Sequence, residues 1–289
     1  MTTASLGLWF RKRSDFPTGG GHRNSGRSHR EKKMISRREN HLTREIELHK
    51  RLAANYTVRY QDAFSQVFQK EWNRALFTMN RTKADRVLEL GCGTGVLLAD
   101  LKQKHRFVVG SDASREMMQA AWKLGALLVA GDGSTLPFGR ASFDLVICRG
   151  VLHHVPDRRA ALAEIHRVLR PGGEFILSEP SNDWWVVRKI RGLMYRFSDK
   201  FDEEDEGFLS DQLRDLIETT GFREIRMGRF GYSAYVLAGF PDHLPLLRYI
   251  PWNVAITRLL IQLDRHWARM PVLNRMSLQL LVSVRRPLF

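Results

Sequence analysis

Cysteine is scarce in this chain. Only Cys92 and Cys148 occur among the 289 residues, and neither has the spacing to other cysteines or histidines that binds zinc. Proteins of oxidising compartments use cysteine far more heavily. The sequence therefore predicts a protein of a reducing compartment with no metal site.

Long apolar segments are also missing. No stretch approaches the ~20 apolar residues that a membrane-spanning helix needs. The apolar residues 6–10, LGLWF, are too few and wrongly flanked for a secretory signal. We expect a cytoplasmic protein, with weak peripheral contact to a membrane left open.

Acidic residues are few at both ends of the chain. Residues 1–50 contain 12 Lys and Arg against 5 Asp and Glu, and residues 222–289 contain 10 against 3, whereas residues 51–221 are nearly balanced at 24 against 23. The net charge of +15 thus comes from the two ends. Such ends favour anionic partners, such as a membrane surface, a nucleic acid or an acidic substrate, although a solvated basic surface is the simpler interpretation.

Residues 11–40 contain hardly any apolar side chains and are rich in Arg, Ser and Gly. Such a composition cannot bury enough surface to fold, so residues 1–42 are predicted to be a disordered basic tail. A mitochondrial transit peptide is a rival interpretation, but Asp15, Glu31 and Glu39 argue against it. A start at Met34 is a third alternative.

The rest of the chain alternates between helical and strand patterns. Large apolar residues recur every four positions across residues 43–80, which predicts one or two amphipathic helices; they are Leu52, Tyr56, Tyr60, Phe64, Phe68, Trp72 and Leu76. Five short apolar runs follow as predicted strands, at residues 86–90, 106–112, 126–132, 143–149 and 173–180. Helical patterns at 95–104, 114–125 and 157–169 separate them. This alternation predicts an α/β fold with a mostly parallel sheet.

The first strand runs into a glycine-rich turn, in the sequence RVLELGCGTG of residues 86–95. Gly91, Gly93 and Gly95 permit a sharp turn that brings backbone close to a ligand at the start of the next helix. The spacing differs from that of dinucleotide-binding loops, and Glu89 precedes the turn. A carboxylate there suits an ammonium group better than a pyrophosphate.

Acidic residues also stand at the ends of the next two strands. Asp112 ends the second strand, where a carboxylate can accept both hydroxyls of a ribose, and Asp132 follows the third, where it can accept from an exocyclic amine. The alternative role for Asp112 is to cap a helix, which Ser114 serves better. A ligand with an amino group, a ribose and an adenine matches Glu89, Asp112 and Asp132 together.

Five motifs in order resemble those of class I S-adenosylmethionine-dependent methyltransferases, specifically the type 11 group that includes ubiquinone- and menaquinone-type enzymes. They are VLELGCGTG, SDASREMM, GDGSTLPF, FDLVICRGVLHHV and LRPGGEFILSEP, and they cover roughly residues 85–180. The resemblance implies a Rossmann-like, doubly wound, seven-stranded sheet whose last strand is antiparallel. It also implies S-adenosylmethionine as cofactor, bound through Glu89, Gly91, Gly93, Gly95, Asp112, Met117, Asp132, Gly133 and Arg149.

The methyl group of this cofactor is already activated, so the enzyme must align an acceptor and, where needed, remove its proton. His153 and His154 follow the fourth strand, and we expect His154 to be the base. The alternative is that one histidine packs inward and the other orients the loop. Asp144 opens the fourth strand at the opposite edge of the sheet, and LRPGG at 169–173 ends a helix through Gly172; both are interpreted as structural.

The acceptor is expected to be a small or lipid-like molecule methylated at a hydroxyl or a carbon. The Asn/Asp-Pro-Pro-aromatic motif of enzymes that methylate bases of nucleic acids is missing after the fourth strand, where this chain has CRGVLHH. Nucleic acid is therefore a disfavoured partner. An RNA methyltransferase that uses the basic ends, and a cofactor-binding regulator without activity, remain rival hypotheses, and the oligomeric state is open.

Two segments outside these motifs are expected to shape the acceptor pocket. Residues 180–206, with Trp184, Trp185, Tyr195 and Phe197 before the acidic run DEEDE at 202–206, suggest an aromatic flap or an ordinary solvated loop and helix. Residues from about 240 to 276 form a helical insertion before a last strand at 278–284. Within a methyltransferase domain of residues 43–289, the core is expected at 85–240. In the insertion helix, the predicted apolar face consists of Ile256, Leu259, Leu260, Leu263, Trp267 and Met270. Its basic and aromatic content suits either packing on the domain or a membrane interface.

Overall fold

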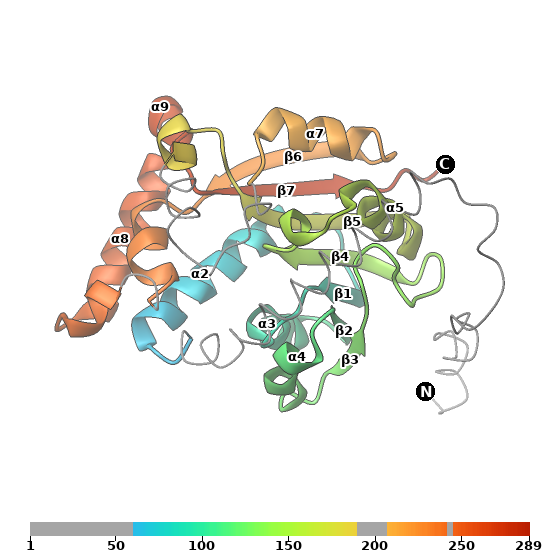
Figure 1. Cartoon of the computed structure of the whole chain (residues 1–289), viewed down its shortest axis with the longest axis horizontal. Coiled ribbons are helices and arrows are strands. Elements are labelled where there is room, and N and C mark those ends of the chain that lie inside the picture. Colours follow the sequence, from blue (N-terminus) through green and yellow to red (C-terminus); the bar gives the residue numbers. More distant parts are fainter. Residues whose placement is uncertain (1–59, 190–206, 242–244) are drawn as a thin grey trace, which may run out of the picture.

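A seven-stranded sheet forms the centre of the molecule, in the order β3-β2-β1-β4-β5-β7-β6 (Figure 1). The computed structural model describes residues 60–189, 207–241 and 245–289. Its strands are β1 (Arg86–Leu90), β2 (Phe107–Asp112), β3 (Leu127–Ala130), β4 (Phe143–Arg149), β5 (Leu169–Pro180), β6 (Arg223–Phe230) and β7 (Gln279–Arg285). Neighbours from β3 to β5 are parallel, and β7 is antiparallel to both β5 and β6. The predicted Rossmann-like sheet with an antiparallel last strand is confirmed.

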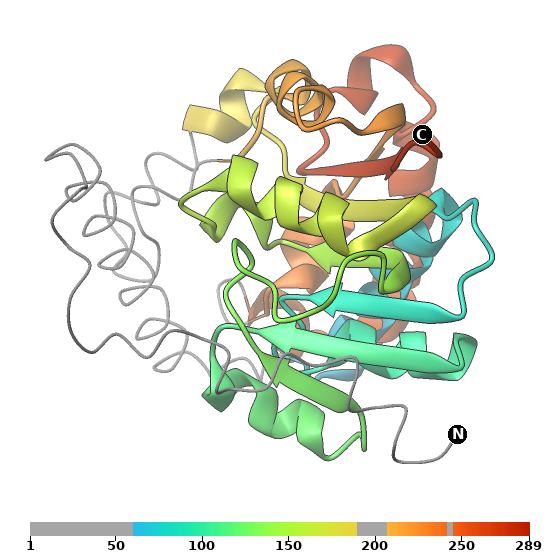
Figure 2. The same cartoon turned by 90° about the vertical axis from the view of Figure 1, so that its right-hand side faces the viewer.

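Helices cover both faces of this sheet (Figure 2). The strands alternate apolar residues between two cores, because successive side chains of a strand point to opposite faces. Leu88 and Val146 contribute to the core beneath α5 (Arg158–Val168) and α7 (Ser210–Glu218), whereas Val87 and Ile147 contribute to the other core. That second core is covered by α2 (Ala63–Met79), α3 (Val96–Lys104) and, near β3, α4 (Arg115–Trp122).

Helix α2 is the described part of the predicted N-terminal helical flank. Its residues Phe64, Phe68, Trp72 and Leu76 are all buried, as their four-residue spacing predicts. The aromatic rings of Phe68 and Trp72 pack against Phe230 at the end of β6. The flank is therefore part of the core. Leu52, Tyr56, the basic tail, and Tyr195, Phe197 and the acidic run of the predicted flap lie outside the described residues.

Four short elements separate β6 from β7, where the insertion was predicted. They are the π-helix η4 (Tyr235–Gly239), the 3-10 helix η5 (Pro245–Tyr249), α8 (Asn253–Trp267) and α9 (Pro271–Asn274). Helix α8 packs against α2. The carboxylate of Asp264 fixes α8 by accepting hydrogen bonds from the backbone N–H groups of residues 232–234, at 2.9–3.2 Å, and from the hydroxyl of Ser233 at 2.6 Å. Among the described residues, none of the helices has the length and apolar content that crossing a bilayer demands.

The predicted apolar face of α8 is divided between the core and the surface. Ile256 and Leu260 pack against the core beside the buried Thr257, Ile261 and Asp264, whereas Leu259 and Leu263 are exposed. Asp264 takes an inward position because its carboxylate has backbone donors there. Leu259 and Leu263 are consequently directed to the outside.

Two residues interpreted as structural behave in different ways. Asp144 accepts hydrogen bonds from the backbone of Asp85 and Arg86 and pairs with Arg170 at 2.5 Å, as a structural role predicts. The prediction that a helix ends through Gly172 is wrong, because α5 ends at Val168 and β5 begins at Leu169. Gly172, with φ +75°, lies instead within β5, where the pairing with β4 shifts register, and its N–H donates to the backbone carbonyl of Arg286.

Candidate active site

The glycine turn follows β1 at the edge of the sheet where the parallel strands end. Gly91 has φ +70°, and a Cβ atom there would lie 2.2 Å from Val151. Gly95 has φ +88° and caps α3, and a Cβ there would meet Leu124 at 2.7 Å and Ala121 at 3.0 Å. Each of these two positions thus requires glycine for both its conformation and its packing.

Asp112 supports this turn from the end of β2. One carboxylate oxygen accepts from the N–H of Gly93 at 2.8 Å, and the other accepts from the N–H of Ser114 at 2.9 Å. Ser114 is the N-cap of α4 and accepts from Met117 N at 3.2 Å, as predicted. A carboxylate has about four lone-pair positions, so Asp112 retains the capacity to accept from a ribose.

Asp132 lies just beyond β3, next to the end of β2. Its carboxylate accepts from the backbone N–H of Ser134 at 3.0 Å and from the Ser134 hydroxyl at 2.8–2.9 Å. These bonds hold a tight turn and fix the direction of the carboxylate. The neighbouring Gly133 has room for a Cβ, whose closest neighbour would be Val155 at 3.6 Å.

Glu89 is a buried carboxylate with an unsatisfied oxygen. Its Oε2 atom has no hydrogen-bond partner within the described chain, and the residue lies one position before the end of β1. Burial raises the pKa of Glu89 well above its usual range; nearby Arg149 opposes this shift, while Asp112 and Asp100 add to it. An unpaired buried acceptor is costly to a protein, so Glu89 is placed to receive a donor that comes with a ligand.

Arg149, at the end of β4, is held by the N-terminal flank. Its guanidinium donates to Asn73 Oδ1 at 2.8 Å and lies 4.7 Å from the centre of the Trp72 ring. Asn73 in turn donates to Asp100 at 2.8 Å, and Trp72 donates to Ser178 at 3.0 Å. Helix α2 therefore belongs to the site. The sequence predicted Arg149 as a site residue but did not predict Asn73 or Trp72 as its partners. The apolar spacing of this helix indicates which side chains pack inward, but not that Trp72 and its neighbour Asn73 contact an arginine.

The two histidines follow β4 in the 3-10 helix η3 (Leu152–His154). His153 Nδ1 is 2.7 Å from Oε2 of Glu179, and the His153 and His154 rings lie 3.9 Å apart between centres. Glu179, at the end of β5, also accepts from the backbone N–H groups of Val151 and Leu152. Burial tends to raise the pKa of Glu179, but the hydrogen bonds from His153 and these N–H groups outweigh it and hold the pKa below its usual range.

Glu179 was not singled out from the sequence, although the signal was present. It is another acid at the end of a parallel strand, like Asp112. The structure places the His153 ring against this carboxylate. This agrees with one half of the alternative given above, in which one of the two histidines packs inward. It does not test the role of His154 as a base, which stays a prediction.

The remaining predicted residues lie at the same edge of the sheet. Met117 is buried on α4, and its terminal methyl group would be 3.6 Å from a Cβ on Gly93. The two cysteines are buried thiols whose pKa values are raised by burial, so neither is a reactive nucleophile. Of the predicted flap, Trp184 is half-buried and Trp185 is exposed. In the described part of the chain, His, Cys, Asp and Glu form no group of three or more that could hold a metal ion.

The chemistry of this edge fits the predicted cofactor. An ammonium group would supply the donor that Glu89 Oε2 lacks, and ribose hydroxyls and an adenine amine would meet the carboxylates of Asp112 and Asp132. Within the glycine turn, Gly93 has the most open Cβ position, with its nearest neighbour, Met117, at 3.6 Å.

Comparison with known proteins agrees with this arrangement. The family model of a methyltransferase domain matches residues 88–177, which run from β1 to β5. This part of the chain is thus similar to the methyltransferase domain family. The demethylmenaquinone methyltransferase of Corynebacterium kroppenstedtii is 40% identical over 95 residues, which cover 33% of this chain and 42% of the relative. That of Staphylococcus epidermidis is 34% identical over 138 residues, covering 44% and 57%. The match thus spans about half the length of these methyltransferases.

Solved structures resemble the fold of this chain over a longer range. A protein described as a possible histamine N-methyltransferase from Thermotoga maritima covers 83% of this chain and 99% of its own, with a TM-score of 0.62 and 17% identity. A methyltransferase solved with the Haloferax volcanii Trm112 activator covers 83% and 97%, with a TM-score of 0.57 and 20% identity. At such identities the likeness shows the fold alone.

Proposed function

We propose that this protein transfers the methyl group of S-adenosylmethionine to an oxygen or carbon atom of a small, hydrophobic, quinone-like acceptor. Most of the support for the cofactor comes from one observation, the buried and unsatisfied Glu89 carboxylate beside the glycine turn. Support for the acceptor class comes from the relatives named demethylmenaquinone methyltransferase. The missing Asn/Asp-Pro-Pro-aromatic motif after β4 argues against bases of nucleic acids.

In this proposal each residue at the strand ends binds a different part of the cofactor. Glu89 binds the ammonium of the methionine moiety, and the turn formed by Gly91, Gly93 and Gly95 cradles this moiety. Asp112 binds the ribose, Met117 flanks the adenine, and Asp132 with the Gly133 backbone binds its amine. Arg149 lies along the methionine side, held there by Asn73 and Trp72.

The methyl-transfer step needs little covalent chemistry from the protein. The acceptor atom forms a bond to the methyl carbon while the bond between that carbon and sulfur breaks, and S-adenosylhomocysteine is released. The proton that the acceptor loses goes to His154 in our proposal. His153 and Glu179 fix the loop that carries His154, because Glu179 binds both the His153 ring and the backbone of η3. Such fixed placement of reacting groups can supply ~7–11 kcal/mol of a barrier.

A labelling experiment tests the proposed function. The protein is incubated with methyl-labelled S-adenosylmethionine and, separately, with demethylmenaquinone in detergent, a fractionated lipid extract, a small-molecule extract and RNA. We expect label in the quinone or lipid fraction and no label with an Asp112→Ala variant. Label in RNA would replace this proposal with the RNA hypothesis, and cofactor binding without label in any fraction would favour a regulator.

A further inference from the structure

Helix α8 exposes an apolar row that packing does not use. Leu259 and Leu263 are 56% and 41% exposed, and they lie about 200° around the helix from Ile261 and the face packed on α2, at 100° per residue. Trp252 at the start of α8 and Tyr249 just before it are 82% and 79% exposed. Met270 and Val272 extend the exposed apolar surface beyond the other end of the helix. Two aromatic rings and four aliphatic side chains on α8 and the segments at its two ends exceed the scattered apolar residues of an ordinary surface.

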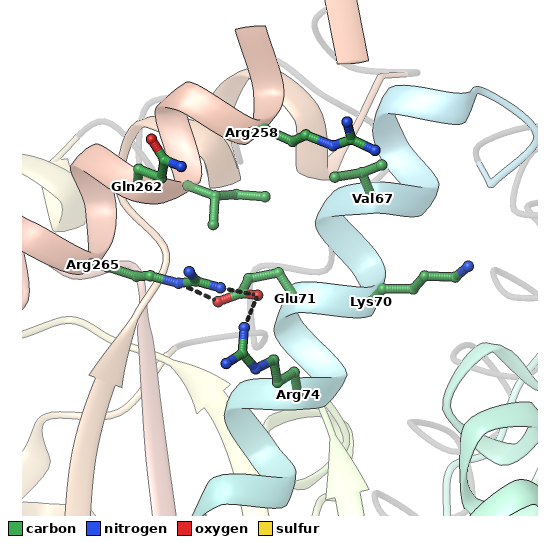
Figure 3. A pocket seen from close by; sticks show the side chains of 8 residues that line it. Val67, Lys70, Glu71, Arg74, Arg258, Gln262 and Arg265 are labelled. Carbon is green, nitrogen blue, oxygen red and sulfur yellow. Dashed lines mark hydrogen bonds and ion pairs between the residues drawn. The ribbon is translucent and has the colours of Figure 1, made fainter. Parts of the chain in front are cut away.

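A groove with a basic lining runs beside this row, between α8 and α2. Its volume is about 320 Å³, and it is lined by Val67, Lys70, Glu71, Arg74, Arg258, Ile261, Gln262 and Arg265. Figure 3 shows Arg258 reaching from α8 toward Val67 on α2, while Lys70 points away from α8. Glu71 is the one carboxylate of the lining, and Arg265 binds it with two hydrogen bonds of 2.6 and 2.8 Å. Arg74 also lies 3.7 Å from Glu71, so the cations of the groove outnumber its acids.

The charge of the surrounding segment has the same sign. Residues 245–276 contain five arginines, at positions 248, 258, 265, 269 and 275, and a single acid, Asp264. Asp264 is buried and occupied by backbone donors, so the acids that pair with these arginines come from the α2 segment: Asp62 pairs with Arg248 and Glu71 with Arg265. The outer side of α8 thus combines apolar side chains, two aromatic rings and flanking arginines.

We infer that the exposed side of α8 docks on the surface of a membrane that contains anionic phospholipid, with a lipid phosphate bound at Arg258 in the groove. An interfacial helix has this composition: its apolar side chains enter the acyl boundary, its Trp and Tyr lie at headgroup level, and its arginines reach the phosphates. A second copy of the chain fits less well, because a symmetric contact would place the same arginines against each other.

This inference rests on the proposed function, since a quinone-like acceptor resides in a bilayer, but the test does not depend on it. The full chain is mixed with vesicles of phosphatidylcholine, with or without phosphatidylglycerol, and sedimented in the absence of cofactor and acceptor. Two variants, Trp252→Ala and Arg258→Glu, change the proposed surface. Two controls, Trp122→Ala and Arg106→Glu, make the same changes elsewhere; Trp122 is 76% exposed on α4, and Arg106 is exposed just before β2.

We expect the anionic vesicles to retain the wild type and both controls, with less retention as salt is added. Arg258→Glu should partition at least about five-fold more weakly, the scale of ~1 kcal/mol per basic residue at an anionic surface, and Trp252→Ala should also partition more weakly because it removes an aromatic ring from headgroup level. Equal retention of each variant and its control would overturn the inference. It would also be overturned if sedimentation velocity showed a dimer that Trp252→Ala abolishes while vesicle binding is unchanged. Demethylmenaquinone methylation in detergent should be the same for all four variants, so a failure of the proposed function is scored separately.

Discussion

The carboxylate of Glu89 opposes folding of the free protein and favours binding of the cofactor. Its pKa is raised chiefly by burial, so the ionised form destabilises the native state at every pH above the ~4.3 of an ordinary glutamate. Glu89→Gln should therefore raise the melting temperature at pH 7. The same change should weaken S-adenosylmethionine binding by roughly 1.5–3 kcal/mol, the scale of a hydrogen bond to a charged group.

Calorimetry at several pH values checks this prediction further. In the wild type, affinity should fall as the pH is lowered through the raised pKa of Glu89, because the protonated carboxyl no longer attracts an ammonium. The loss should begin at a higher pH than an exposed glutamate would give. Glu89→Gln should show no such dependence; a variant with wild-type affinity would remove Glu89 from the site.

The two adjacent histidines should respond differently to replacement. His153→Ala removes the side-chain partner of the buried Glu179 carboxylate, and we expect it to cost on the order of 2–3 kcal/mol of unfolding free energy. His154→Ala should change stability little but lower the turnover rate by about 10²–10⁴-fold, the usual contribution of a general base. Denaturant unfolding and the labelling assay measure the two effects. Full turnover by His154→Ala would eliminate it as the base.

Some residues of the candidate site can be predicted from the sequence and others cannot. Asp112 and Asp132 were found because a strand end can be located from an apolar run, and parallel strands share an edge. Asn73 was not found, since it acts from a helix that joins the site only through tertiary packing against Arg149. Such a contact between positions 76 residues apart leaves no local pattern.

At the scale of elements, the glycine turn is the part of the fold that tolerates least change. Gly91→Ala would force a Cβ to within 2.2 Å of Val151 at φ +70°, so we expect a loss of at least about 2 kcal/mol in unfolding free energy. Gly133→Ala is the matched control, because its Cβ would make ordinary contacts of 3.6 Å or more. Thermal unfolding compares the two. Similar melting temperatures would mean that Val151 and the following η3 move aside at little cost in free energy, so the turn does not require glycine at position 91.

Element boundaries and faces show where pattern reasoning fails. The helices α3, α4 and α5 begin within one residue of their predicted starts, because glycine, Ser114 and Asp157 mark them. The predicted apolar face of α8 is divided between the core and the surface, since periodicity finds apolar residues but not which of them meet a neighbour. The hydrogen bonds from the backbone of residues 233 and 234 to Asp264 determine the orientation of α8, because they hold Asp264 inside and so leave Leu259 and Leu263 outside.

At the scale of the whole molecule, Glu174 joins segments that are distant in sequence. This fully buried carboxylate on β5 accepts from the backbone and side chain of Arg81 after α2, at 2.8 and 2.9 Å, and from Ser283 on β7. Arg81 also forms an ion pair with Glu224 on β6, at 3.1 Å. Burial tends to raise the pKa of Glu174, but the hydrogen bonds from Ser283 and Arg81 outweigh it, so its pKa lies below the usual range.

The stability that Glu174 contributes should therefore depend on pH in a defined direction. A carboxyl whose pKa is lower in the folded than in the unfolded state stabilises the protein fully above the unfolded value, ~4.3, and loses that contribution as the pH falls through the folded value. At pH 7, Glu174→Gln should lower the unfolding free energy by on the order of 2 kcal/mol, because the partly buried Arg81 loses the buried one of its two carboxylate partners. Below about pH 4 the difference between variant and wild type should shrink toward zero. Glu218→Gln is the control, since its pair with Arg214 is exposed and 4.0 Å long, and should cost less than about 0.5 kcal/mol at any pH. Urea unfolding at pH 3 to 7 measures both variants, and a Glu174→Gln difference that stays constant down to pH 3 would mean that its carboxylate charge does not hold these strands together.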